Sequence, residues 1–238
     1  MTMVNVRHVT GLAAALLVAG CATSEPTEPF YTSSAAPATT TAGAAPSSSK
    51  ARSIPKAIPA SAFLQVSDAP EKARQKPARA DHDLPAFCGK SYEQKDRIGV
   101  RATQLLLIQS KGESEGSTPK SAVYEDVLVY RGDGAKEFMT DLRAAVKNCA
   151  SDEDDKNFLR GSIEAGDDSE LIEQSTPATD DAGEPVQGQP SRLFWAVVRH
   201  ADTIAFVSNT GWESSGAEKA DTVKLGTRAA ARVKEWRG

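Results

Sequence analysis

The chain has few of the residues that metal centres and redox sites require. Its 238 residues include three histidines and three cysteines. His82 and His200 have no second histidine or cysteine at zinc-ligand spacing, and no Cys-X-X-Cys pair occurs. His200 and Asp202 lie two residues apart, which fits a tight turn better than a hydrolase site. We therefore expect no metal, no cofactor and no catalytic residue, and a protein that is not an enzyme.

The sequence also lacks a hydrophobic run long enough to cross a bilayer. The longest N-terminal apolar run, residues 9–19, has about a dozen residues, whereas a spanning helix needs roughly 20. Arg7 and His8 precede it. A short apolar core behind a basic residue is typical of an export signal, so residues 1–20 are predicted to be a signal peptide.

The residues Leu17-Val18-Ala19-Gly20-Cys21 end this signal. They resemble the lipobox of bacterial lipoproteins, in which the cysteine thiol receives diacylglycerol before cleavage ahead of it. The resemblance implies a mature chain that begins with lipidated Cys21 and stays on the outer face of the cytoplasmic membrane, because two or more acyl chains anchor a protein stably. The alternative is a secreted protein cleaved elsewhere in the Ala-rich segment.

If Cys21 carries lipid, Cys88 and Cys149 are the two cysteines that remain. Export takes them to a compartment where disulfides persist, and we predict that they pair. Such a bond closes a loop of about 60 residues and stabilises the fold by roughly 4 kcal/mol. The alternative is two free buried thiols.

Composition divides the rest of the chain in two. Residues 21–52 are rich in Ser, Thr, Ala and Pro and are predicted to form a disordered tether, either a plain linker or one that carries sugars. Residues 53–238 are long enough for one domain with a proper core. The formal net charge is −4, and scattered basic residues give no nucleic-acid footprint.

Hydrophobic patterning predicts an α+β domain, a twisted, mainly antiparallel sheet packed by two or more helices. An amphipathic helix is expected at 135–149, with Cys149 on its apolar face, and another at 217–236. Strands are expected at 100–109 (where a helix stays open), 123–130, 158–164, 170–175, 192–199 and 203–208. Residues 71–83 and 176–191 are expected to be loops.

Four aromatic residues are the candidates for a ligand cleft. Tyr124 and Tyr130 share one face of a predicted strand, Trp195 lies within another, and Trp212 follows a Thr-Gly pair. Trp195 fits the core as well as a cleft. The acidic residues 152–155 do not continue as a calcium loop, because Asn157 and Ile163 stand where Gly and Glu are needed.

These features together resemble the PknH-like extracellular sensor domain family of actinobacterial lipoproteins and kinase ectodomains. The features are the lipobox, the tether, Phe87-Cys88-Gly89, the helix ending at Cys149, and the late Trp195 strand before a final helix. The resemblance implies a twisted sheet flanked by helices, with a ligand-binding cleft. The kinase members have two disulfides, whereas this chain has cysteines for one.

Two functions are therefore expected. The first is a membrane-anchored extracytoplasmic lipoprotein with a sensor-like domain that binds a small molecule, a lipid or a wall fragment. The second is a structural lipoprotein that docks on a cell-envelope protein. A cavity lined by Trp and Tyr favours the first, whereas a flat exposed apolar patch favours the second.

Overall fold

The computed structural model describes residues 52–238 except 79–81, 115, 153–154, 180–184 and 212–216. These residues belong to one unit of the chain, residues 49–238. The predicted signal peptide, Cys21 and nearly all of the predicted tether lie outside the described residues. Trp212 lies outside them as well.

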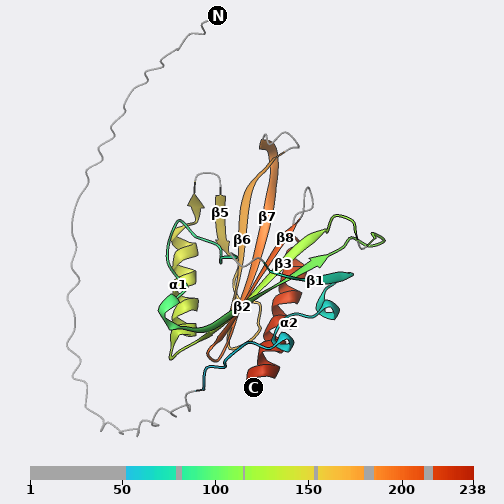
Figure 1. Cartoon of the computed structure of the whole chain (residues 1–238). Helices are drawn as coiled ribbons and strands as arrows, with labels where there is room; N and C mark the ends of the chain where they lie inside the picture. Colours follow the sequence, from blue (N-terminus) through green and yellow to red (C-terminus); the bar gives the residue numbers. More distant parts are fainter. Residues whose placement is uncertain (1–51, 79–81, 115, 153–154, 180–184, 212–216) are drawn as a thin grey trace, which may run out of the picture. The chain divides into compact units, whose positions relative to one another are not determined.

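An antiparallel sheet of eight strands forms the centre of this unit (Figure 1). Every neighbouring pair of strands is antiparallel. In spatial order the strands are β1 (Ala73–Pro77), β2 (Ile98–Ile108), β3 (Ser121–Tyr130), β8 (Thr203–Gly211), β7 (Pro185–His200), β6 (Asp168–Thr179), β5 (Asp155–Leu159) and β4 (Ser151–Asp152). The predicted α+β class is confirmed, because helices pack on this sheet.

Both faces of the sheet carry buried apolar residues. Successive residues of a strand point to opposite faces. In β8, Ile204 and Phe206 belong to one core cluster, whereas Ala205 and Val207 belong to another. A sheet with two apolar faces needs a cover on each. The two long helices supply these covers, one on each side (Figure 1).

Helix α1 (Gly134–Asn148) covers the first face. Phe138, Leu142 and Val146 recur every four residues and are buried, as expected for the inner stripe of an amphipathic helix. They share a core cluster with Trp195 of β7, which is 3% exposed. The predicted helix at 135–149 is thereby confirmed.

Helix α2 (Lys219–Arg237) covers the second face. Leu225, Ala229 and Val233 pack in the cluster of that face. A Cβ atom added at Gly226 would lie 2.5 Å from the Cβ of Ala196 in β7, so a larger residue there would push the helix away from the sheet. Three short 3-10 helices are η1 (Ala60–Ala62), η2 (Val66–Asp68) and η3 (Lys95–Arg97). Of these, η1 and η2 lie beside α2.

Cys88 and Cys149 form a disulfide with a Cα–Cα distance of 5.6 Å, which confirms the predicted pair. Cys149 caps the C-terminal end of α1 and is buried. Cys88 lies in a tight turn closed by a hydrogen bond of 2.9 Å from the Lys90 N–H to the Phe87 carbonyl. The bond therefore ties the segment at residues 84–92 to the end of the helix.

Two segments that we predicted as loops contain strands. Residues 73–77, within the charged stretch 71–83, pair with Gln104–Ile108 as the edge strand β1. Residues 176–179 and 185–191, within the acidic stretch 176–191, extend β6 and β7 into a two-stranded ribbon (Figure 1). In both places the charged, proline-containing sequence is compatible with a strand at a sheet edge, where only one side must pair.

Candidate functional site

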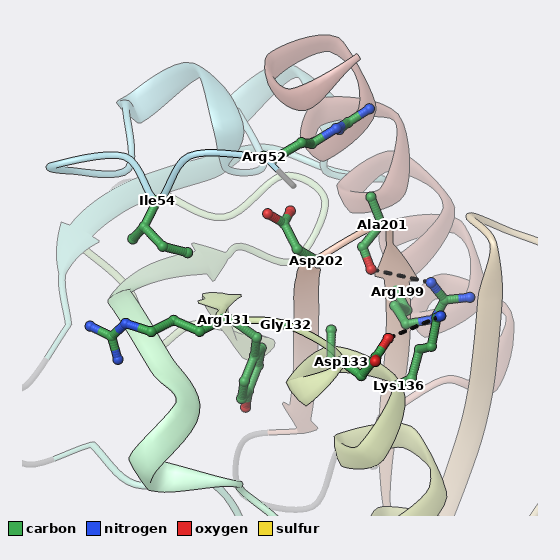
Figure 2. A pocket seen from close by; sticks show the side chains of 11 residues that line it. Arg52, Ile54, Arg131, Gly132, Asp133, Lys136, Arg199, Ala201 and Asp202 are labelled. Atoms are coloured by element: carbon green, nitrogen blue, oxygen red, sulfur yellow. Dashed lines mark hydrogen bonds and ion pairs between the residues drawn. The ribbon is translucent and has the colours of Figure 1, made fainter. Parts of the chain in front are cut away.

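A pocket of about 450 Å³ opens where α1 begins. Three segments that are distant in sequence form it: residues 52–54, the turn from β3 into α1, and the turn from β7 into β8 (Figure 2). Its lining consists of Arg52, Ile54, Tyr130, Arg131, Gly132, Asp133, Ala135, Lys136, Arg199, Ala201 and Asp202. The volume falls within the range of small-molecule sites, about 300–1,000 Å³.

The strand β3 and the β7–β8 turn are locked together beneath this pocket. The Tyr130 N–H donates to the Asp202 carbonyl at 2.8 Å. The Tyr130 hydroxyl donates to the Glu93 carbonyl at 2.8 Å, and its side chain is buried. Burial of this phenol raises its pKa above the ordinary value, because the ionised form would lose its hydration. Tyr130 is therefore a neutral, fixed part of the floor.

The β7–β8 turn is held from its other side by Asp167. Ala201 has a φ of 52°, and its N–H donates to Asp167 Oδ2 at 2.6 Å. Arg199 Nη1 donates to the Ala201 carbonyl at 3.2 Å and lies 3.5 Å from Asp167 Oδ2. These bonds hold a non-glycine residue in the left-handed region, and the turn wall of the pocket is accordingly well defined.

The third segment, residues 52–54, lies against the sheet because β2 offers a residue without a Cβ. A Cβ atom at Gly99 would lie 2.5 Å from Ile54 Cγ2, so the Ile54 side chain occupies that space. Arg52 donates through Nη1 to the Arg237 carbonyl at the end of α2. The start of the described chain is thus part of the pocket wall.

Basic side chains outnumber acidic ones in the lining. Arg52, Arg131, Lys136 and Arg199 are cationic, whereas Asp133 and Asp202 are anionic. Asp133 already pairs with Lys136 at 3.1 Å, and Asp202 pairs with Arg237 at 2.6 Å. The pocket therefore carries an excess of two positive charges around an apolar floor of Ile54, Ala135 and the Tyr130 ring.

Of the predicted cleft residues that the structure describes, Tyr130 lines this pocket, whereas Tyr124 and Trp195 do not. Trp195 is in the core, where its ring meets the Phe87 ring edge-on at 5.6 Å. Tyr124 is stacked against His82 at 4.1 Å between ring centroids. Tyr124 and Trp195 therefore lie apart from the pocket that Tyr130 lines.

A buried polar cluster surrounds Tyr124 on the α1 face of β2 and β3. The Asp126 carboxylate accepts hydrogen bonds from Arg101 Nε at 3.0 Å and Thr103 Oγ1 at 2.5 Å, and lies 3.3 Å from His82 Nε2. Arg101 also donates to the His82 carbonyl at 3.0 Å. Each polar group has a partner, so the cluster explains how the segment near His82 is fixed to the sheet.

One motif in the chain is typical of hydrolases, and no other feature of the sequence pointed to it. Residues 112–116 have the pattern Gly-X-Ser-X-Gly around Ser114. In α/β-hydrolases this pattern occupies a sharp turn from a strand into a helix. Here it lies in the connection between the antiparallel strands β2 and β3, and Ser114 is exposed. The structural context that gives the motif its chemistry is therefore different.

The fold and site define an antiparallel α+β domain, covered on both faces, with a basic pocket at one end of its sheet. No family model, curated protein or solved structure matches the chain. None of the helices that the structure describes is long and apolar enough to cross a membrane. Within the same residues, no group of three or more His, Cys, Asp or Glu side chains could hold a metal ion.

Proposed function

We propose that this protein is a lipid-anchored extracytoplasmic lipoprotein whose folded domain binds a small molecule without chemical conversion. The pocket at the start of α1 is the observation that carries the proposal, because it combines a suitable volume, an apolar floor and several polar groups. Both of its carboxylates, Asp133 and Asp202, are paired with cations, so neither is free to act as a general base. The lining is therefore suited to holding a ligand and not to converting it.

Two features support the extracytoplasmic location in this proposal. The Cys88–Cys149 disulfide is typical of proteins that fold in an oxidising compartment. The residues Leu17 to Cys21 resemble a lipobox, and the basic and apolar residues before them resemble an export signal. Membership of the PknH-like sensor family is part of the same proposal and rests on the sequence features named above.

The envelope-docking alternative has less support. A docking patch requires contiguous exposed apolar area. Among the residues that the structure describes, the exposed large hydrophobic side chains are Val66 and Leu159, which lie in η2 and at the end of β5. They belong to separate elements, so the pocket is the better candidate for a binding surface.

Replacing Cys21 tests the anchor. We expect Cys21→Ala to move the protein from the membrane fraction to the soluble fraction, because the mature chain would lose its acyl chains. Fractionation of cells expressing each form measures this. Thr23→Ala is the matched control and should leave the protein in the membrane. A Cys21→Ala protein that stays in the membrane fraction would contradict the anchor.

The binding role is tested by amide NMR of the full-length Cys21→Ala chain with a library of small neutral and charged fragments. We expect bound fragments to shift the amide signals of Gly132, Ala135 and Ala201, which line the pocket. Shifts that cluster instead near Ala102 would point to the shallower hollow beside β1. A screen without shifts at the α1 pocket would refute the proposed site.

A further inference from the structure

Two arginines at the pocket carry charges that no described carboxylate neutralises. Arg131 is exposed and donates through Nη1 to the Ile98 carbonyl at 2.9 Å. Arg52 donates to the Arg237 carbonyl. Within the described part of the chain, neither guanidinium forms an ion pair. Since a guanidinium has five N–H donors, both retain donors for an anionic ligand.

The other two cations of the pocket have carboxylate partners, Asp133 for Lys136 and Asp167 for Arg199. Lys136 is largely exposed, and so is its partner Asp133, so their ion pair is weak in water. Arg199 keeps its Nε buried without a hydrogen-bond partner and shares Asp167 with His200. The four basic residues that line the pocket come from its three segments (Figure 2). The Arg131 side chain extends outward from the turn between β3 and α1 (Figure 2).

The backbone direction of α1 contributes to the same potential. Gly132, Asp133, Ala135 and Lys136 belong to the first turn and its approach. The N-terminal end of a helix carries a partial positive charge that favours phosphate groups and other anions. The Gly134, Lys136 and Glu137 N–H groups already donate to the Arg131 and Asp133 carbonyls, so this helix end contributes its dipole. The excess side-chain charge comes from Arg52 and Arg131.

We propose that the pocket binds a phosphate ester. The anionic group would be held by Arg52, Arg131 and Lys136 beside the positive end of α1, and its organic part would lie on Ile54, above the buried Ala135 and Tyr130. This inference rests on the binding function proposed above. The volume of about 450 Å³ is larger than a bare phosphate ion needs. The pocket therefore has room for an organic group attached to the phosphate. Excess charge favours a phosphate, which can carry two charges, over a monocarboxylate.

The same chemistry has two sources outside a cell membrane. One is a soluble phosphate ester, and the other is the headgroup of an anionic phospholipid. Arg52 directly follows the segment that leads back to Cys21, so a lipid-anchored chain would hold this pocket within reach of headgroups.

The probes are glycerol 1-phosphate, uncharged glycerol, and vesicles of either phosphatidylcholine alone or phosphatidylcholine with 30% phosphatidylglycerol. The full-length Cys21→Ala chain is titrated in about 150 mM salt, where the Debye length is about 8 Å. Amide shifts of Gly132, Ala135 and Lys136 report binding of the soluble probes, and co-sedimentation reports binding to vesicles. We expect binding of glycerol 1-phosphate or of the anionic vesicles, but not of glycerol or neutral vesicles.

Charge-removal variants locate the site. Arg131→Gln combined with Lys136→Ala should weaken binding of the productive probe at least tenfold. Lys147→Ala is the matched control, because Lys147 is an exposed lysine in the last turn of the same helix, and it should change affinity less than twofold. Arg131 and Lys136 are both exposed, so the variant should fold, which a thermal unfolding curve verifies.

Every outcome decides the inference. Binding of glycerol 1-phosphate alone assigns a soluble ester, and binding of anionic vesicles assigns a lipid headgroup. Equal losses in the double variant and in Lys147→Ala would show general surface electrostatics and overturn the inference. If neutral fragments bind at the pocket but neither phosphate probe does, the phosphate inference fails and the binding function stands. If nothing binds there, both fail.

Discussion

Glu125→Gln is expected to raise the free energy of unfolding strongly at pH 9 and to change it little at pH 5. Glu125 lies on β3 beneath η1 and η2 and is 1% exposed. Its Oε2 accepts the Leu64 N–H at 2.6 Å, and its Oε1 has no hydrogen-bond partner. Burial, the main cause, raises the pKa of this carboxyl from its ordinary 4.5 to about 8.

The sign of the effect follows from proton binding. Between pH 4.5 and 8 the unfolded chain loses the Glu125 proton while the folded chain keeps it, so the unfolded state binds fewer protons. The free energy of unfolding therefore falls as pH rises through this interval, by up to about 5 kcal/mol at 1.36 kcal/mol per pKa unit. Below pH 4.5 both states are protonated and the contribution is fully present. An amide at this position does not titrate.

Urea unfolding of the full-length chain and of Glu125→Gln between pH 5 and 9 measures this difference. The two curves should diverge as pH rises, by several kcal/mol at pH 9. Glu235→Gln is the control, since Glu235 is an exposed glutamate on α2, and its curve should run parallel to that of the unaltered protein. Parallel curves for Glu125→Gln would contradict a buried neutral Glu125. Asp68 and Asp168, whose pKa values are lowered, act in the acid range instead.

Removing the disulfide is the second large change. We expect Cys88→Ser with Cys149→Ser to reduce the free energy of unfolding by roughly 4 kcal/mol, because the bond closes a loop with a sequence separation of 61 residues. For a domain of this size that corresponds to a fall in melting temperature of about 8–16 °C.

Residues beside the disulfide depend on it for their position, so its removal should destabilise the segment around Cys88 first. Asn157 Nδ2 donates to the Cys149 carbonyl at 2.9 Å, and Phe87, next to Cys88, packs on Trp195. Without the bond, residues 84–92 can lift from the core, and amide exchange there should increase first. Thermal unfolding with and without reductant provides the control, because reductant should destabilise the unaltered protein and leave the double variant unchanged. Equal melting temperatures of oxidised and reduced protein would refute the expected contribution.

Hydrophobic patterning predicted the elements that bury apolar side chains. The expected helices at 135–149 and 217–236 correspond to α1 and α2, and the alternating segment at 123–130 is β3. These segments bury regular stripes of Leu, Val and Phe, and such stripes are visible in sequence. The buried character on both sides of β3 was also correct, since Val127 and Leu128 are both fully buried.

Hydrophobic patterning did not predict strands that are defined by hydrogen-bond pairing with a neighbouring strand and bury few side chains. In β1, Ala73 is buried, whereas Gln75 and Lys76 are exposed, so its sequence does not differ from that of a polar loop. The strand exists because β2 is long enough to accept a partner at Gln104–Ile108. The ribbon beyond Ser175 likewise continues the β6–β7 hairpin past its last buried residues, Glu173 and Phe194.

The pocket could not be predicted because its parts meet only through tertiary structure. Arg52, Arg131 and Arg199 belong to three segments separated by more than 60 residues each, and each alone is an ordinary surface arginine. The local signal was the Gly132-Asp133-Gly134 turn between a strand and a helix, which positions the helix start. Among the aromatic candidates, Tyr130 lines the pocket and Trp195 packs in the core.

The contact between the beginning and the end of the described chain has a consequence for engineering. Arg237 donates to the Ser53 carbonyl at 3.5 Å, and Arg52 donates to the Arg237 carbonyl. A fluorescent or affinity tag fused after Gly238 would therefore emerge beside the pocket and next to the chain that leads to Cys21. Reporter fusions for imaging or capture are better inserted between β2 and β3, where the exposed Lys111 and Glu113 tolerate added sequence.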